Sequence, residues 1–317
     1  MKRREFLRLM GLGLAGACAG GRVSWPREAA AAPKLRLAFL ADAHLTDGDA
    51  RRPEAQSLAR AVAELRGLNP APELVLFAGD LAHRGNPAAL ALGREILNDL
   101  PAPCLMLMGE GDGQPDKAAP WRRFFGEPWF SHLMHQAVNG KQQTTLQILG
   151  LHIAWGPGPD GPVFRMGGAG RHWLARELDR LDPEVPLLIV SHPPLDPIFR
   201  PWQQWTLDGP EVLAQVSRFR QVLCLHGHTH HAVASGQWLV VSKSNDLGEV
   251  FITENRKLKT EKHLLSLSLS ATAWPGPQAI QGTPARLGPG LGPRGCGWTL
   301  LAAEAASFKL QPQVWEA

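Results

Sequence analysis

The stretch LRLAFLADAH (residues 35–44) is an apolar run of strand length that ends on two polar side chains, Asp42 and His44. Short apolar runs of this kind are typical of buried strands. Similar runs cover residues 74–78, 104–108, 144–155 as two short pieces, 187–190 and 221–225. Between the first two, Leu58, Ala61, Val62 and Leu65 repeat with the spacing of an amphipathic helix. The alternation predicts an α/β fold with helices covering the sheet faces.

The pattern changes after about Val233. Runs at 237–242 and 249–253 are short and no long helical period separates them, which favours antiparallel strands. Residues 271–297 contain five prolines and seven glycines and predict an irregular loop before strands at 298–303 and 308–314. We expect residues 32–317 to form one domain, with a separate C-terminal β unit as the alternative.

The N-terminus carries features of an export leader. MKRREFLRLMGLGLAGACAG (residues 1–20) has a basic start and a short apolar segment, and Arg3 and Arg4 lie in a stretch that resembles a twin-arginine signal. Ala29 to Ala31 would supply the small residues for cleavage, giving a signal peptide of residues 1–31. The resemblance implies the twin-arginine export machinery as a partner and a periplasmic or extracellular location. Cys18 is an alternative lipid attachment site, although the preceding leucine is misplaced by one position.

The basic charge of the chain is concentrated in this leader. The first 31 residues hold six basic and two acidic residues, a net charge of +4 that equals the net charge of the whole chain. The remainder is neutral and has no basic cluster interleaved with aromatics, which argues against nucleic-acid binding. No apolar run approaches the ~20 residues of a membrane span. Cys104, Cys224 and Cys296 show no C-x-x-C spacing, so a zinc ribbon is not indicated.

Five of the apolar runs end on residues that bind metals. These residues are Asp42 and His44, Asp80, Glu110 and Asp112, His192, and His228 with His230. Ligands of open α/β sheets bind beyond the carboxyl ends of strands, where all of these clusters are expected. Residues at i and i+2 of an extended segment point to one side, so Asp42 and His44, like His228 and His230, should share a cavity. Glycines at 79, 109 and 227 would allow sharp turns there.

Each of these residues has an ordinary alternative role. A lone aspartate after a strand is most often a turn or cap residue, and a lone histidine beside prolines is usually a surface group. Their joint occurrence at five strand ends favours a metal site. Carboxylates mixed with imidazoles suit Zn, Mn or Fe better than Ca, and Asp80 is the natural bridging ligand for a pair of ions.

These motifs resemble the calcineurin-like metallophosphoesterase family, whose D-x-H, G-D, G-N-H-D, H and G-H-x-H signatures follow in this order. The resemblance implies a four-layer α/β/β/α sandwich of two mostly mixed sheets flanked by helices. It implies two divalent metal ions, Mn, Fe or Zn, and a phosphoester substrate hydrolysed by a hydroxide that bridges them. One ion would be held by Asp42, His44, Asp80 and His230. The other would be held by Asp80, Glu110, His192 and His228.

The chain departs from the family pattern at GEGD (residues 109–112). Glu110 replaces the asparagine, and Gly111 replaces a histidine that acts on the phosphate or the leaving group, while Asp112 remains. Loss of a proton donor typically costs 10²–10⁴ in rate. The catalytic residue is therefore unknown, with His83 as a weak substitute. We favour an active enzyme over a metal-binding protein that has lost catalysis and serves in binding or sensing.

Two other classes fit the sequence less well. Amidohydrolases place H-x-H early and an aspartate late, the reverse of the order here, and an adhesion module gives no reason for ligands at strand ends. Around the histidine-rich stretch LHGHTHH (225–231), we expect His226 and His231 to lie near the ligands or at the surface without binding metal. Residues 156–170 and 193–205, with Arg165, Arg200 and Trp202, are either walls of the substrate pocket or surface loops.

Overall fold

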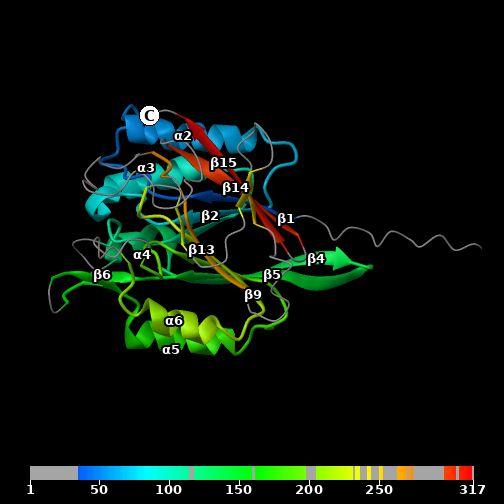
Figure 1. Cartoon of the computed structure of the whole chain (residues 1–317). Coiled ribbons are helices and arrows are strands. Elements are labelled where there is room, and N and C mark those ends of the chain that lie inside the picture. The colour runs from blue at the N-terminus through cyan, green and yellow to red at the C-terminus, as the bar shows by residue number, and fades with distance from the viewer. Residues whose placement is uncertain are drawn as a thin grey trace, which may run out of the picture. The chain divides into compact units, whose positions relative to one another are not determined.

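The computed structural model describes residues 35–113, 118–158, 161–197, 205–230, 233–235, 241–243, 250–252, 263–269, 271–273, 296–304 and 307–315 (Figure 1). The predicted export leader with Cys18, most of the predicted loop at 271–297, and Arg200, Trp202 and His231 lie outside these residues. Among the described helices, none is both long and apolar enough to cross a membrane.

The first sheet has seven strands in the order β11-β12-β15-β14-β1-β2-β3. They are β11 (Val241–Lys243), β12 (Val250–Ile252), β15 (Ser307–Trp315), β14 (Cys296–Glu304), β1 (Leu35–Leu40), β2 (Leu74–Ala78) and β3 (Cys104–Leu107). β1, β2 and β3 run parallel, whereas β14 pairs with β1 antiparallel, Leu37 lying opposite Leu301. The last two strands of the chain therefore belong to the same sheet as its first strand.

The second sheet has six strands in the order β10-β13-β9-β8-β5-β4. They are β10 (Val233–Ser235), β13 (His263–Ser268), β9 (Gln221–His226), β8 (Leu187–Ser191), β5 (Lys141–Leu151) and β4 (Phe130–Val138). The four central strands are parallel, and the edge strands β10 and β4 pair antiparallel. A separate hairpin joins β6 (Ala154–Gly156) and β7 (Val163–Arg165).

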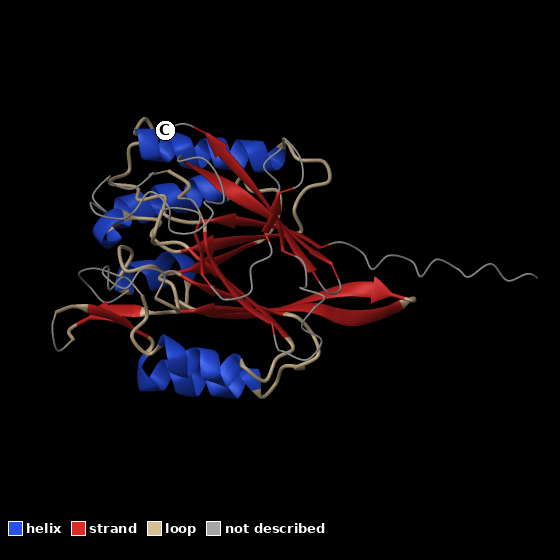
Figure 2. Cartoon of the chain, viewed as in Figure 1, coloured by secondary structure: helices blue, strands red, loops and turns tan. Residues whose placement is uncertain are grey.

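Helices cover the outer face of each sheet, as Figures 1 and 2 show. The helices are α2 (Pro53–Arg66), α3 (Pro87–Leu97), α4 (Ala119–Phe125), α5 (Gly167–Leu178) and α6 (Gly209–Val216), with a 3-10 turn η2 (His83–Gly85). One core packs α2 and α3 on the first sheet, and another packs α5 and α6 on the second. A third core, including Leu37, Leu76, Val190 and Leu225, lies between the two sheets. The predicted four-layer α/β/β/α architecture is confirmed.

The predicted helix around Leu58 and Val62 forms, because its apolar face packs against the first sheet. Prolines at the start of α2 and α3 fit the first turn, where the missing N–H would have no partner in the helix. β4 is an element that the sequence did not indicate. Pairs of polar residues separate its apolar residues at a sheet edge, so no continuous apolar run marks it.

Candidate metal centre

All seven predicted ligands follow the carboxyl ends of strands. Asp42 and His44 come after β1, Asp80 after β2 and Glu110 after β3. His192 comes directly after β8, and His228 and His230 follow β9 in the second sheet. Because the strands within each set are parallel neighbours, their carboxyl ends bring these turns together.

The backbone at five of these seven residues is left-handed rather than extended. φ is +57° at Asp42, +48° at His44, +54° at Asp80, +62° at His228 and +56° at His230. Asp42 and His44, like His228 and His230, face one site as predicted, but the extended backbone assumed for these pairs is wrong. Aspartate and histidine are among the residues that tolerate this region. Each side chain is aimed by a turn that begins where the strand stops.

Backbone hydrogen bonds connect the two turns of the first sheet. Asp42 N donates to Gly79 O and His44 N donates to Asp80 O, both at 2.9 Å. Gly79 has φ +94°, and a Cβ there would lie 2.6 Å from His192 Nδ1. At Gly227 a Cβ would lie 2.7 Å from Asp42 Oδ2. Real Cβ atoms do not approach so closely, and only glycine lets these turns meet.

One group of donor atoms consists of Asp42, His44 and His230. His44 Nε2 and His230 Nε2 are 3.0 Å apart, and His230 Nε2 lies 3.2 Å from Asp42 Oδ1. His44 Nε2 lies 3.8 Å from the same oxygen. Two imidazoles and a carboxylate thus face one small volume, which is the donor set that borderline divalent metals prefer.

A second group consists of Glu110, His192 and His228. Glu110 Oε2 lies 2.9 Å from His192 Nε2, and Glu110 Oε1 lies 2.9 Å from His228 Nδ1. Asp80 lies between the two groups, because its Oδ2 is 3.7 Å from His44 Nε2 and 3.5 Å from His192 Nε2. The structure therefore brings all seven predicted residues together, and Asp80 lies between the two groups, where the predicted bridging ligand is expected.

The surrounding hydrogen bonds fit a metal site. His192 Nδ1 lies 2.7 Å from Ala78 O, so that nitrogen carries the proton and donates to the carbonyl. Its Nε2 atom then faces Asp42, Asp80 and Glu110, the orientation found in histidines that bind metals. Asp80 Oδ1 accepts from Gly111 N at 2.7 Å, which leaves Oδ2 facing the histidines. These residues fit a pair of divalent ions in ligand type and orientation.

The electrostatics of the centre favour ionised carboxylates. Burial opposes ionisation of Asp42, but His230, His192 and His44 outweigh it and lower its pKa to about 2. His228 and His192 likewise hold the pKa of Glu110 well below its ordinary value despite burial. Burial disfavours a charged His192, yet the nearby carboxylates raise its pKa well above the usual range. The buried carboxylates Asp42 and Glu110 are therefore held in the ionised form that binds cations.

Comparison with known proteins identifies the family to which a chain with this site belongs. A family model described as calcineurin-like phosphoesterase matches residues 35–232, which span β1 to the last predicted ligand. The chain belongs to the calcineurin-like phosphoesterase family. It is therefore a phosphoester hydrolase by family, as the resemblance of its motifs implied, with metal-binding residues in place.

Relatives in the calcineurin-like phosphoesterase family cover most of the folded part. A probable cyclic nucleotide phosphodiesterase of Synechococcus sp. is 30% identical over 212 residues, 65% of this chain and 77% of that protein. A probable glycerophosphodiester phosphodiesterase of Arcobacter nitrofigilis is 25% identical over 235 residues, 71% of this chain and 82% of that protein. The crystal structure of a dimetal phosphatase from Danio rerio superposes with a TM-score of 0.58 at 11% identity, covering 89% of this chain and 97% of that one. The last comparison supports the fold alone.

The calcineurin-like pattern is interrupted at Gly111, where the backbone is tightly held. Gly111 N donates to Asp80, Gly111 O accepts from Gly85 N at 2.6 Å, and a Cβ on Gly111 would lie 3.1 Å from the Asp80 carboxylate. Asp112 is fully buried and accepts from Ala82 N and Gly109 N, so it connects two turns. Burial and the nearby Asp80 raise the pKa of Asp112 to about 8.

His83 lies in the turn that touches this position. The His83–Gly85 turn donates to Gly111 O through Gly85 N, and His83 N donates to Leu45 O at 2.8 Å. The His83 side chain is exposed. His83, the substitute proton donor suggested by the sequence, therefore lies in a turn that is hydrogen-bonded to Gly111, the residue in the position of the family's histidine.

His226 differs from a surface histidine. Its side chain is fully buried, with Nδ1 2.8 Å from Ser191 Oγ and Nε2 2.6 Å from Ser266 Oγ. Ser191 Oγ donates its proton to Pro193 O, so it accepts from His226 Nδ1. The Nε2 atom then accepts from Ser266, which requires a neutral ring. Burial lowers the pKa of His226 to about 3, in agreement with this assignment.

This network ties β8, β9 and β13 together at the carboxyl ends where His192 and His228 begin. Sequence reasoning also missed Phe164 of β7, whose ring lies 4.7 Å from that of His228 and 4.5 Å from that of Trp155. Two aromatic residues flanking a Gly/Pro-rich turn were the available signal for this hairpin. Of the two segments expected as pocket walls, residues 156–170 therefore contact the predicted ligand His228 through Phe164. Arg165 of this segment is exposed.

Proposed function

We propose that this chain is an exported phosphodiesterase that works through two divalent ions, Mn, Fe or Zn, held at the carboxyl ends of β1, β2, β3, β8 and β9. The observation that carries the proposal is the pair of three-residue donor groups on either side of Asp80. Ions bound there would polarise the phosphoryl group and supply a water of lowered pKa as nucleophile. The surrounding protein would orient the ligands through the Ala78 and Gly111 backbone.

The charge of the ligand set supports a diester substrate. Asp42, Asp80 and Glu110 contribute three negative charges, one more than a set with asparagine at position 110. Two divalent ions and these carboxylates would then sum to a net charge of +1, which a bridging hydroxide would reduce to zero. Such a centre favours a monoanionic diester over a dianionic monoester, relative to the family pattern. The printed functions of both relatives, a cyclic nucleotide and a glycerophosphodiester phosphodiesterase, are in line with this preference.

The absent histidine supports the same substrate class. Gly111 offers no proton donor, and a leaving group that needs little protonation makes such a donor less important. His83 lies in the turn whose Gly85 N donates to Gly111 O, so it is the substitute donor that we consider. We therefore expect faster turnover of diesters with acidic leaving groups than of alkyl monoesters.

Two substrates and a metal analysis test this function. Protein stripped of metal and reloaded with Mn, Zn or Fe should bind about two ions per chain. It should hydrolyse bis(p-nitrophenyl) phosphate faster than p-nitrophenyl phosphate. Stoichiometric metal without turnover on a broad panel of phosphoesters would refute the enzyme and leave the binding or sensing alternative.

Export through the twin-arginine machinery is a separate part of the proposal. It rests on the paired arginines and the Ala29 to Ala31 segment of the sequence. The wild-type chain should reach the periplasm or medium, whereas an Arg3→Lys, Arg4→Lys variant should remain inside the cell. A mature N-terminus after Ala31 supports cleavage, and a lipid on Cys18 would establish the alternative.

A further inference from the structure

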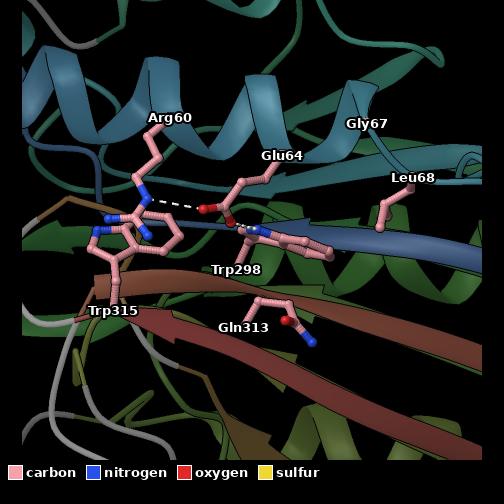
Figure 3. A pocket seen from close by; sticks show the side chains of 7 residues that line it. All are labelled: Arg60, Glu64, Gly67, Leu68, Trp298, Gln313 and Trp315. Atoms are coloured by element: carbon pink, nitrogen blue, oxygen red, sulfur yellow. Dashed lines mark hydrogen bonds and ion pairs between the residues drawn. The ribbon is translucent and has the colours of Figure 1, made fainter.

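A cavity lies away from the predicted ligands, between α2 and the strands β14 and β15 (Figure 3). It has a volume of about 400 Å³ and is lined by Arg60, Glu64, Gly67, Leu68, Trp298, Gln313 and Trp315. None of the seven candidate metal ligands is among these residues. Volumes of roughly 300–1,000 Å³ are usual for sites that bind small molecules.

Glu64 is the hub of the polar groups in this cavity. Its Oε1 accepts from Arg60 Nε and its Oε2 accepts from Trp298 Nε1, each at 2.9 Å. The Arg60 guanidinium also lies over the ring of Trp315, 4.4 Å from its centroid. Figure 3 shows these side chains linking helix and sheet. One carboxylate thus fixes the orientation of two indole rings that come from different strands.

Helix stability does not account for this arrangement. An arginine four residues before a glutamate is the weaker order for a pair on a helix, and exposed pairs of this type contribute only ~0.3–0.5 kcal/mol. Arg60 keeps 53% of its side chain exposed, whereas Trp298 is only 3% exposed. The Arg60–Glu64 pair positions the Trp315 ring at the protein surface, where tryptophan and arginine often mark binding sites.

The charges of the lining point to a neutral ligand. Arg60 and Glu64 neutralise each other, and no other charged residue lines the cavity within the part of the chain that the structure describes. A phosphate or sulfate would therefore find no unpaired cation there. A purely hydrocarbon ligand is disfavoured as well, because it would remove Gln313 and the Arg60–Glu64 pair from water without replacing their hydrogen bonds.

We infer that this cavity is a binding site for a neutral saccharide. A pyranose ring has apolar C–H faces that pack on indole rings, and hydroxyl groups that pair with planar polar side chains. Trp315 and Leu68 would supply the apolar surface, and the exposed carboxamide of Gln313 both donates and accepts hydrogen bonds. The site is separate from the metal centre, and its existence does not depend on the phosphodiesterase proposal.

Calorimetry on the metal-loaded full chain tests the inference with maltohexaose, cellohexaose and N-acetylated chitohexaose. At least one of these neutral probes should bind, with a Kd of about 0.1–10 mM. Trp315→Ala should weaken that binding about tenfold or more, and Trp315→Phe should largely retain it. Hydrolysis of bis(p-nitrophenyl) phosphate should be the same in all of these proteins.

Further variants keep the test decisive if Trp315→Ala folds poorly. Gln313→Ala changes an exposed strand residue and should also weaken binding. Trp173→Ala, which removes a half-buried ring that packs on Trp129 over the other sheet, is the matched control and should bind like wild type. Three results would overturn the inference: no binding of any neutral probe at about 10 mM, full binding by Trp315→Ala, or binding of an anionic heparin hexasaccharide alone.

Discussion

Replacement of His226 by leucine should loosen the second group of metal ligands. Leucine fills much of the ring volume, so the main loss is polar. The Ser266 hydroxyl loses its acceptor and Ser191 Oγ loses a donor, both inside the protein. A buried group left without its partner costs about 1–3 kcal/mol, and Ser191 keeps its bond to Pro193 O. We therefore expect a loss of about 2–4 kcal/mol in the free energy of unfolding.

The loss should show in two independent measurements. For a domain of this size it corresponds to a fall in Tm of about 4–16 °C. Because Ser191 precedes His192 and His226 lies two residues before His228, the affinity for the metal ion held by Glu110, His192 and His228 should fall about 10–100-fold. Thermal unfolding followed by circular dichroism, and metal titration with a competing chelator, measure these effects.

Two control variants distinguish loss of the Ser191–His226–Ser266 hydrogen bonds from a general effect of substitution on stability. His226→Gln retains one donor and one acceptor and should recover part of both losses. Ser217→Ala removes a serine hydroxyl bond to Ala214 O at an exposed position and should change neither measurement. If the free energy of unfolding of His226→Leu is within about 0.5 kcal/mol of wild type and the variant binds two ions normally, the Ser191–His226–Ser266 network does not support the metal ligands.

Four other predictions concern the centre and its surroundings. Asp80→Ala should abolish binding of the ion pair and diesterase activity together, as seen by metal analysis; a variant with two ions and normal kcat would exclude Asp80 as the bridge. His83→Ala should lower kcat for an alkyl phosphoester by about 10²-fold or more while sparing a p-nitrophenyl ester, and equal losses on both would rule out a proton donor. Gly227→Ala should reduce metal affinity and stability, because the new Cβ would press on Asp42; unchanged chelator titrations would contradict this. Burial lowers the pKa of His152 to about 4, so the folded protein binds fewer protons at this residue than the unfolded chain between pH 6.5 and 4. The resulting stability, at most about 3 kcal/mol, is present above pH 6.5 and is lost as the pH falls through 4. In urea unfolding, the free energy of unfolding of His152→Gln should therefore depend less on pH than that of the wild type.

The sequence predicted the alternation of strands and helices and the positions of the candidate ligands because both are local patterns, whereas the four layers were expected from the family resemblance. An apolar run followed by aspartate or histidine can be recognised without knowing its neighbours, as at Leu40 and Asp42. The path of the backbone after each strand could not be predicted in the same way. Whether a chain turns left-handed at Asp80 depends on contacts with Gly109 and Gly111, which come from another strand end.

Partners distant in sequence account for the other gaps. His226 was predicted only as a neighbour of the ligands or a surface group, because its partner Ser266 lies 40 residues further along the chain. Trp298 and Glu64 are separated by 234 positions, so no local sequence pattern indicated the cavity between α2 and the strands β14 and β15. Asp112 shows the same limitation, since its burial and its bonds to Ala82 and Gly109 turn a family motif residue into a structural support.

The left-handed turns at the candidate ligands have a consequence for laboratory evolution. A residue other than glycine in that region costs of order 1 kcal/mol or more, and five of the seven candidate ligands lie there. Glycine at any of the five would relax the backbone while deleting a donor atom. A library selected for heat resistance alone should therefore accumulate glycine at these positions and lose hydrolysis first, whereas a library grown under metal-dependent selection should retain aspartate and histidine.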